Sequence, residues 1–356
     1  MTTQTIDETK QAAFGEKMME VMNHGFLGLT LSAGHRTGLF DSMSTLDRAT
    51  SEEHARHAGL DERYVRELLG GLVTGGIVEY FPEDQTYRLP PEHAAFVTRA
   101  AGPDNIAAML EYLGLLGSVE DQIVECARNG GGVPYSSFTR FHELMRQESG
   151  AIFDATLLES TLPLVPGLPE QLERGIDVAD IGCGSGHAIG LMAEAYPASR
   201  FTGYDFSEQA LGVARQEAAD RGLSNATFEL QDVGKLDVVE GYDLITAFDT
   251  IHDQAEPRKV LANAARALRP GGTFLMVDIA ASSNLEDNID HPLGPLMYTI
   301  STFHCMTVSL ALGGEGLGTV WGEQKAQELL KEAGFTSVDV HRVEGDIQNN
   351  YYIARR

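Results

Sequence analysis

The sequence contains little cysteine, little tryptophan and little positive charge. Its 356 residues include three cysteines and one tryptophan, and 26 basic residues face 52 acidic ones, for a formal net charge of −26. Three scattered thiols give neither a disulfide framework nor a zinc-ligand spacing. The first eight residues lack the basic and apolar segments of a signal peptide. So acidic a surface repels nucleic acid and anionic membranes. We therefore expect a cytoplasmic protein without metal, nucleic-acid or membrane partners.

Long apolar runs are also scarce. Residues 292–314 carry no formal charge, and a segment of this length would suffice to cross a membrane. The segment nevertheless contains Gly294, Pro295, His304 and several hydroxyl side chains. This polarity predicts a lid that lines a cavity, within an insert over residues 282–320.

The most informative segment is VADIGCGSGH, which begins at Val178. A short apolar strand leads directly into a turn with glycines at 182, 184 and 186, and a helix is expected over 188–196. Glycine permits a positive φ and leaves no Cβ between the backbone and a ligand. Backbone N–H groups at a helix N-terminus, beside the end of a parallel strand, form a site typical of nucleotide binding. A tight turn without a ligand is the alternative.

The glycine spacing separates two classes of nucleotide site. The dinucleotide fingerprint would require glycine at position 187 or 189. Those positions hold His187 and Ile189. The spacing therefore argues against a nicotinamide-dependent oxidoreductase.

The strands that follow end in carboxylates. The segment 200–205 ends in Asp205, 23 residues beyond Gly182, and the strand that begins at Phe228 ends in Asp232. An acid at the first of these positions can accept both ribose hydroxyls of a nucleoside. Two further strands are expected, at residues 242–249 and 268–278, and helices separate the strands. This alternation predicts a parallel, doubly wound sheet.

Residues 178–356 resemble class I S-adenosylmethionine (SAM)-dependent methyltransferases. The motifs DIGCGSG and LRPGG, together with the acids after the second and third strands, occur in the family's order. The resemblance implies an α/β, Rossmann-like, doubly wound and mostly parallel seven-stranded sheet, with SAM as cofactor and S-adenosylhomocysteine (SAH) as product. It implies these cofactor-binding residues: Asp180, Gly182, Gly184, Gly186, Asp205, Phe206, Asp232, Val233 and Asp249. For Asp249, capping a helical turn is the alternative.

The N-terminal region shows a winged-helix pattern. A capping box at Thr50 and Glu53 opens one helix, a second helix covers 61–73, and a hairpin follows at 77–89. A DNA-recognition helix should be basic, whereas this second helix mixes acids and arginines. Similar domains in small-molecule methyltransferases serve dimerisation, and the apolar positions within 8–48 predict a homodimer.

These features predict three parts. They are a helical winged-helix domain over 1–103, a helical connector over 104–170 and a SAM-binding domain over 171–356. The connector is expected to contribute a wall of the acceptor pocket, or else plain interdomain core. The predicted acceptor-pocket residues are Tyr135, Phe138, Phe141, Met297, His304 and Trp321. For His304 the alternative is a hydrogen-bonded core histidine, and for Trp321 an anchor of the lid.

The candidate catalytic residues are His252 and Asp253, directly after the fourth strand. The pair is similar to the His-Asp of plant-type O-methyltransferases, which implies a catalytic histidine, and imidazole titrates near neutral pH as a general base should. That family has tryptophan next, where this chain has Gln254, so its substrate preference is not carried over. A positioning role for His252 is the alternative. The sequence thus predicts methyl transfer to a hydroxyl, thiol or nitrogen of a small molecule. A non-catalytic SAM-binding regulatory protein is the competing reading.

Overall fold

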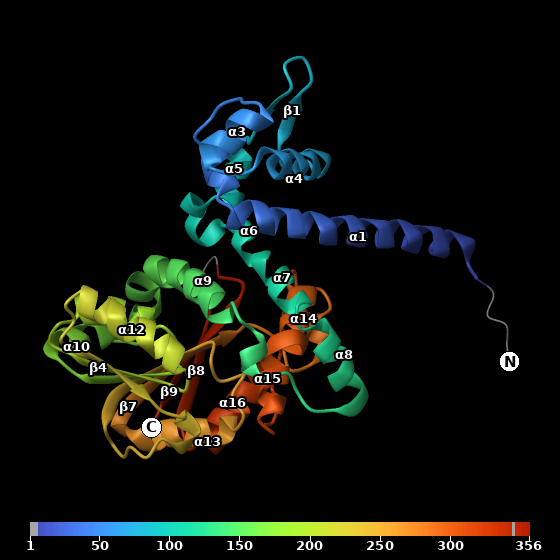
Figure 1. Ribbon diagram of the computed structural model, residues 1–356. Helices are drawn as coiled ribbons and strands as arrows, with labels where there is room; N and C mark the ends of the chain where they lie inside the picture. The colour runs from blue at the N-terminus through green and yellow to red at the C-terminus, as the bar shows by residue number, and fades with distance from the viewer. Residues whose placement is uncertain (1–5, 344–345) are drawn as a thin grey trace. The chain divides into compact units, whose positions relative to one another are not determined.

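A computed structural model describes residues 6–343 and 346–356. The chain divides after Gly117 into two compact units, which are described separately (Figure 1). Residues 104–117, expected in the connector, thus group with the N-terminal unit, and the remainder of the connector groups with the sheet.

The N-terminal unit is helical, with a small hairpin. The long helix α1 (Glu8–Arg36) leads into the winged-helix elements α3 (Ser51–Ala58), α4 (Glu62–Thr74), β1 (Glu79–Phe81) and β2 (Thr86–Arg88). Its other elements are α2 (Leu39–Met43), α5 (Pro91–Val97), the 3-10 helix η1 (Arg99–Asp104), α6 (Ile106–Met109) and α7 (Glu111–Gly117). The predicted capping box is confirmed, because Thr50 and Glu53 exchange side chain–backbone hydrogen bonds of 3.3 and 2.9 Å.

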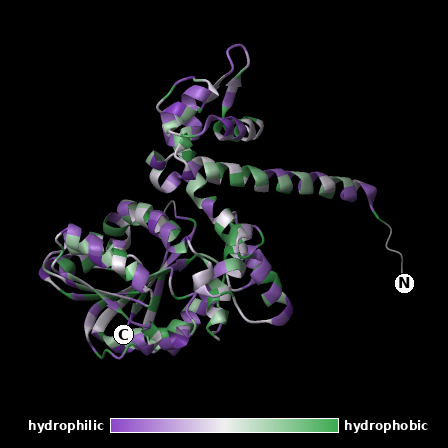
Figure 2. Cartoon of the chain, in the orientation of Figure 1, coloured by the Kyte–Doolittle hydropathy of each residue, from purple (hydrophilic) through white to green (hydrophobic). Residues whose placement is uncertain are grey.

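The core of this unit excludes most of α1. Buried apolar side chains come from α2, α3 and α4, among them Phe40, Val65 and Leu69. Along α1, by contrast, large apolar side chains remain exposed, and Figure 2 shows hydrophobic residues along much of this helix. They are Phe14, Met18, Met19, Val21, Met22, Phe26 and Leu29.

The second unit begins with helices that lead to the sheet. The first of them is α8 (Glu120–Asn129), which a break near Ser118 separates from α7 of the first unit, and another break near Leu110 separates α7 from α6. Glycines at 114 and 117 lower the helix propensity there. The remaining elements before the sheet are η2 (Tyr135–Ser137), α9 (Phe141–Thr156), the π-helical turn η3 (Leu157–Thr161), η4 (Leu162–Leu164) and α10 (Leu168–Arg174).

The predicted seven-stranded, mostly parallel sheet is confirmed. Its strands are β3 (Asp177–Ile181), β4 (Arg200–Asp205), β5 (Ala226–Leu230), β6 (Tyr242–Phe248), β7 (Leu268–Ile279), β8 (Ser337–His341) and β9 (Asn349–Arg355). The strand order is β5-β4-β3-β6-β7-β9-β8, with β9 antiparallel to both of its neighbours. The order reverses between β3 and β6, where α/β sheets of this kind bind their ligands at the carboxyl edge.

Helices cover both faces of this sheet. Side chains of α13 (Pro257–Ala267) and α16 (Gly322–Glu332) pack on one face, and those of α10 and α11 (His187–Ala195) pack on the other. Between the strands lie α12 (Glu208–Asp220), η5 (Val233–Lys235), η6 (Leu285–Asn288), α14 (Gly294–Ile300), the π-helical turn η7 (Ser301–Cys305) and α15 (Met306–Ala311). Within the described residues, no helix is both long enough and apolar enough to cross a membrane.

Candidate functional site

The three glycines after β3 have different roles. All three have positive φ values, 71° at Gly182, 53° at Gly184 and 75° at Gly186. A Cβ at Gly182 would lie 2.0 Å from Thr250 Oγ1, and one at Gly186 would lie 2.4 Å from the Phe228 ring. A Cβ at Gly184 would meet nothing within 4 Å. Packing therefore requires the outer two glycines, while Gly184 exposes its backbone to open space, as a ligand cradle does.

Asp205 lies against this glycine turn. Its Oδ2 accepts a 2.9 Å hydrogen bond from Gly184 N, and its Oδ1 accepts one of 2.7 Å from Ser207 N. Each carboxylate oxygen keeps a second acceptor site, which two ribose hydroxyls can use. Burial raises the pKa of Asp205, although these hydrogen bonds oppose the shift. The neighbouring Phe206 is half exposed and offers a ring face beside the carboxylate.

The other predicted cofactor residues lie in different surroundings. Asp180 is buried, accepts a 2.7 Å hydrogen bond from Thr246 Oγ1, and has its pKa raised to about 7 by burial. Asp232 is exposed, caps η5 through Gly234 N and pairs with Lys235 at 2.8 Å. Val233 packs into the core. An adenine amine can reach the carboxylate of Asp232 but not the side chain of Val233.

His252 is hydrogen-bonded to a carboxylate that sequence reasoning did not single out. Its Nδ1 lies 2.8 Å from Oδ1 of Asp278, at the end of β7, and both side chains are buried. Trp321 Nε1 donates to the same oxygen at 3.0 Å, and so does the backbone N of Ile279 at 2.8 Å. Trp321 therefore supports this pair. The only sequence signal for Asp278 was a carboxylate ending an otherwise apolar strand.

The charge of Asp278 changes the titration of His252. Burial acts to lower the pKa of His252, but the Asp278 carboxylate outweighs it and holds the pKa well above its usual value. Cys305, in the uncharged segment 292–314, acts on the pKa of His252 in the same direction as Asp278. The predicted partner, Asp253, instead accepts from Gln254 Nε2 at 3.2 Å. Burial raises the pKa of Asp253 to about 6.

Four of the six predicted acceptor-pocket residues come together in an aromatic cluster. The His304 ring stacks on Phe141 with centroids 3.6 Å apart, and it meets Phe138 and Tyr135 edge-on at 4.6 and 5.2 Å. The Tyr135 ring also meets Phe206, at 5.7 Å, beside the glycine turn. Met297 is buried in α14, and Trp321 lies with Asp278. The cluster thus reaches from His304 in η7 to Phe206, one of the predicted cofactor-binding residues.

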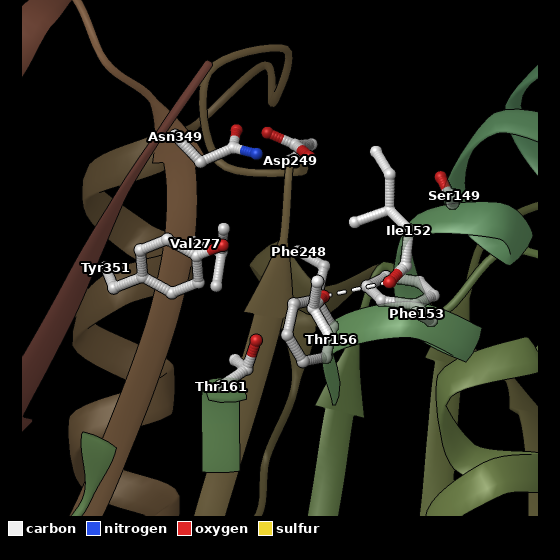
Figure 3. Close-up of a pocket in the computed structure, with 10 residues that line it drawn as sticks. All are labelled: Ser149, Ile152, Phe153, Thr156, Thr161, Phe248, Asp249, Val277, Asn349 and Tyr351. Carbon is white, nitrogen blue, oxygen red and sulfur yellow. Dashed lines mark hydrogen bonds between the residues drawn. The ribbon is translucent and has the colours of Figure 1, made fainter. Parts of the chain in front are cut away.

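A small pocket opens at the end of β6 (Figure 3). Its lining combines apolar side chains with hydroxyl, amide and carboxylate groups, from Ser149, Ile152, Phe153, Thr156, Thr161, Phe248, Asp249, Val277, Asn349 and Tyr351. Asp249 has a φ of 49°, an unusual conformation for a non-glycine residue that occurs at functional sites. The next residue, Thr250, borders Gly182, so the pocket adjoins the glycine turn.

One set of side chains at this edge has metal-ligand chemistry. Asp249, His252 and Asp278 each offer one ligand atom, all within 4.8 Å of one another. However, the Nδ1 of His252 and Oδ1 of Asp278 already share a 2.8 Å hydrogen bond, and Trp321 donates to the same oxygen. We therefore assign these atoms to a hydrogen-bonded network.

Two family models match the chain. Residues 25–99 match the Rv2258c-like winged HTH domain, and residues 172–344 match the Methyltransferase domain. Among curated relatives, the chain is 30% identical over 128 residues to Methyltransferase GfsG of Streptomyces halstedii, covering 34% of this chain and 46% of that protein. It is 31% identical over 109 residues to a Ubiquinone biosynthesis O-methyltransferase of Coxiella burnetii, covering 30% and 44%. The matches therefore span slightly less than half of these relatives.

Solved structures match over nearly the whole chain. A putative O-methyltransferase of Nostoc punctiforme has a TM-score of 0.73 at 19% identity, covering 96% of this chain and 98% of that one. Human N-acetylserotonin methyltransferase, in complex with SAM, has a TM-score of 0.70 at 17% identity, covering 100% and 99%. At these identities the likeness shows the fold.

Proposed function

We propose that this protein, whose C-terminal region is a class I SAM-dependent methyltransferase domain behind a winged-helix domain, transfers a methyl group from SAM to a small-molecule acceptor. One observation carries the proposal. The same sheet edge holds a glycine turn with an open backbone at Gly184 and, after β6, the buried pair of His252 and Asp278. The first suits a nucleoside and the second suits proton transfer, so donor and acceptor would meet there.

The residues present fit SAM. Gly184 offers open backbone, Asp205 offers acceptors for ribose hydroxyls, Asp232 is exposed for an adenine amine, and Asp249 borders the pocket beside the turn. Bound SAM supplies a methyl group already activated by its sulfonium. The protein therefore needs mainly to orient the acceptor and exclude water.

His252 is proposed to accept the proton of the acceptor. Its Nδ1 is engaged by Asp278, which fixes the tautomer and leaves Nε2 as the basic atom of the neutral ring. Because Asp278 holds the pKa of His252 well above its usual value, the neutral ring is favoured at alkaline pH, and activity is expected to rise with pH. His252 is itself buried, which limits the access of water to this Nε2 atom. Asp278 is thus a positioning residue, and Asp253 lies beside the pair without bonding to it.

SAH formation tests the whole proposal. The purified chain, supplied with SAM and a mixed panel of phenols, thiols and ring nitrogen compounds, is expected to release SAH in step with a methylated product. SAM binding without turnover of any acceptor would instead favour the non-catalytic regulatory reading.

Asp205→Ala is expected to weaken both SAM and SAH binding by about tenfold to hundredfold. Losing a charge-assisted acceptor for a nucleoside hydroxyl costs about 1.5–3 kcal/mol. Isothermal calorimetry on the variant measures this loss. The matched control is Asp237→Ala, because Asp237 is exposed and pairs only weakly with Arg266, at 3.5 Å. Unchanged affinity in Asp205→Ala would refute the ribose assignment.

We also propose a homodimer joined through α1. The exposed apolar side chains of Phe14, Met18 and Met22 recur every four residues, and more follow along the helix. A helical stripe of this kind suits a second helix of the same sequence.

Met18→Glu with Met22→Glu is expected to convert the dimer to a monomer, since two buried charges would face the partner helix. Light scattering should give about 77 kDa for the wild type, twice the chain mass of 38.6 kDa, and one chain mass for the variant. The control Asn23→Glu adds one such charge outside the stripe and should stay dimeric. A wild-type monomer at micromolar concentration would contradict the proposal.

We propose that the protein lies in the cytoplasm. The three cysteines are unpaired thiols, which suits the reducing cytoplasm. The acidic balance of the chain makes nucleic acid an unfavourable partner for the winged-helix domain.

A further inference from the structure

His304 is a buried histidine without a hydrogen-bond partner. Its side chain is fully buried, and among the residues that the structure describes neither ring nitrogen has a partner. Buried polar groups are nearly always hydrogen-bonded, because leaving one unsatisfied costs stability. An imidazole with two unsatisfied nitrogens is therefore a costly way to fill a core position.

The backbone around His304 is also unusual and firmly held. His304 lies in the π-helical turn η7, between α14 and α15, and such turns are frequent at functional sites. Val133 N donates a 2.8 Å hydrogen bond to Thr307 Oγ1, and a Cβ at Gly132 would lie 2.1 Å from Thr307 O. The connector thus packs tightly against α15 and fixes the backbone that presents His304.

The rings around His304 place it beside the proposed proton acceptor. Phe141 stacks on it, Phe138 and Tyr135 meet it edge-on, and the charge of His252 acts on both His304 and the next residue, Cys305. Burial, together with the positive charge of a protonated His252, lowers the pKa of His304 to about 3. The ring therefore stays neutral, with one nitrogen as donor and the other as acceptor.

We propose that His304 recognises the methyl acceptor by donating a hydrogen bond to an uncharged oxygen that the acceptor carries beside the group to be methylated. This inference rests on the proposed function and specifies its substrate class. The class is flat ring compounds that bear a hydroxyl or carbonyl oxygen next to the methylated group. Flat rings already pack on His304, because Phe138, Phe141 and Tyr135 all contact it, and a flat acceptor would extend this packing.

Charge excludes anionic acceptors from this class. The neutral imidazole of His304 offers an anion no compensating charge, and the carboxyl groups of Asp205, Asp253 and Asp278 lie around the same edge. A carboxylate on the acceptor would therefore be buried among groups of its own sign. A hydroxyl or carbonyl oxygen carries no such penalty.

The first test is His304→Phe. Because the substitution removes two unsatisfied buried nitrogens and keeps a ring, the melting temperature should rise by about 2–4 °C. SAM affinity should be unchanged. The control is His54→Phe, since His54 is equally buried but Nε2 lies 3.2 Å from Tyr87 O in the N-terminal unit. This control should lose stability and keep its acceptor preference. A fall in the melting temperature of His304→Phe would overturn the proposal, because it would reveal a structural bond.

The second test measures acceptor preference. Catechol and 2-hydroxyacetophenone carry a neighbouring uncharged oxygen, phenol carries none, and salicylate carries a carboxylate. Calorimetry with the SAH-loaded wild type should show the first two binding at least about tenfold tighter than phenol or salicylate, and His304→Phe should abolish that difference. A wild type without this preference, or a variant that keeps it, would overturn the proposal.

The two proposals fail in different ways. If the chain binds neither SAM nor SAH, the proposed function fails. If SAH binds but the two-oxygen compounds gain no advantage that depends on His304, only the role of His304 fails.

Discussion

His252→Ala is expected to lower turnover by about 10²–10⁴-fold while the affinity for SAM changes little. The loss falls on the transition state, because a general base acts only while the acceptor gives up its proton. The Nε2 of His252 has this role in the proposal, and Asp278 holds the opposite ring nitrogen at 2.8 Å. Single-turnover rates and SAM calorimetry on the same preparation separate the two quantities.

Acceptors of graded acidity distinguish proton transfer from positioning. For acceptors already ionised at the assay pH, the defect of His252→Ala should shrink, because no proton remains to be removed. The control His341→Ala, at an exposed position on β8, should match the wild type throughout. An equal loss for every acceptor would contradict the base role and leave His252 as a positioning residue.

Asp278→Asn is expected to lower turnover by about 10²-fold or more and to move the acid limb of the pH–rate profile to lower pH. The Asp278 carboxylate holds the pKa of His252 above its usual value against the opposing effect of burial, so losing its charge lowers that pKa. The neutral, basic form of His252 then persists to lower pH. The rate still falls, because the amide no longer fixes the productive tautomer or stabilises the imidazolium. A pH–rate profile of kcat measures both effects.

Trp321→Phe is the matched control for Asp278→Asn. It removes one hydrogen bond to Asp278 Oδ1 but keeps the carboxylate charge and most of the ring volume. The acid limb should therefore not move to lower pH, and the loss of rate should be smaller than for Asp278→Asn. A profile of Asp278→Asn that superimposes on the wild type would exclude the coupling between Asp278 and His252.

The sheet could be predicted from the sequence because the residues that mark its strands and turns lie within short segments of the chain. Gly182 and Gly186 are required by contacts of their missing Cβ atoms, and Asp205 closes its strand against the turn. The capping box at Thr50 is likewise contained within four residues. Features of this kind can be read from spacing alone.

The features that sequence reasoning missed depend on packing across the fold. His252 has an aspartate next to it in the chain, but its hydrogen-bond partner is Asp278, 26 residues away on β7. The sequence spacing does not show whether a carboxylate such as Asp278 merely ends a strand or also orients the His252 ring. The lack of partners at His304 is equally invisible, because it depends on which rings of α9 pack against the lid. Tertiary contacts decide both.

The acidic edge of the sheet also bears on how the protein exchanges ligands. Burial raises the pKa values of Asp180, Asp205 and Asp253, so these carboxyls give up their protons less readily than exposed ones. A cationic donor bound beside these carboxyls would favour their ionised forms and so release their protons, whereas the product has an uncharged sulfur. Turnover therefore removes the charge that the edge favours. We therefore expect the proposed site to bind the cationic donor more tightly than the uncharged product.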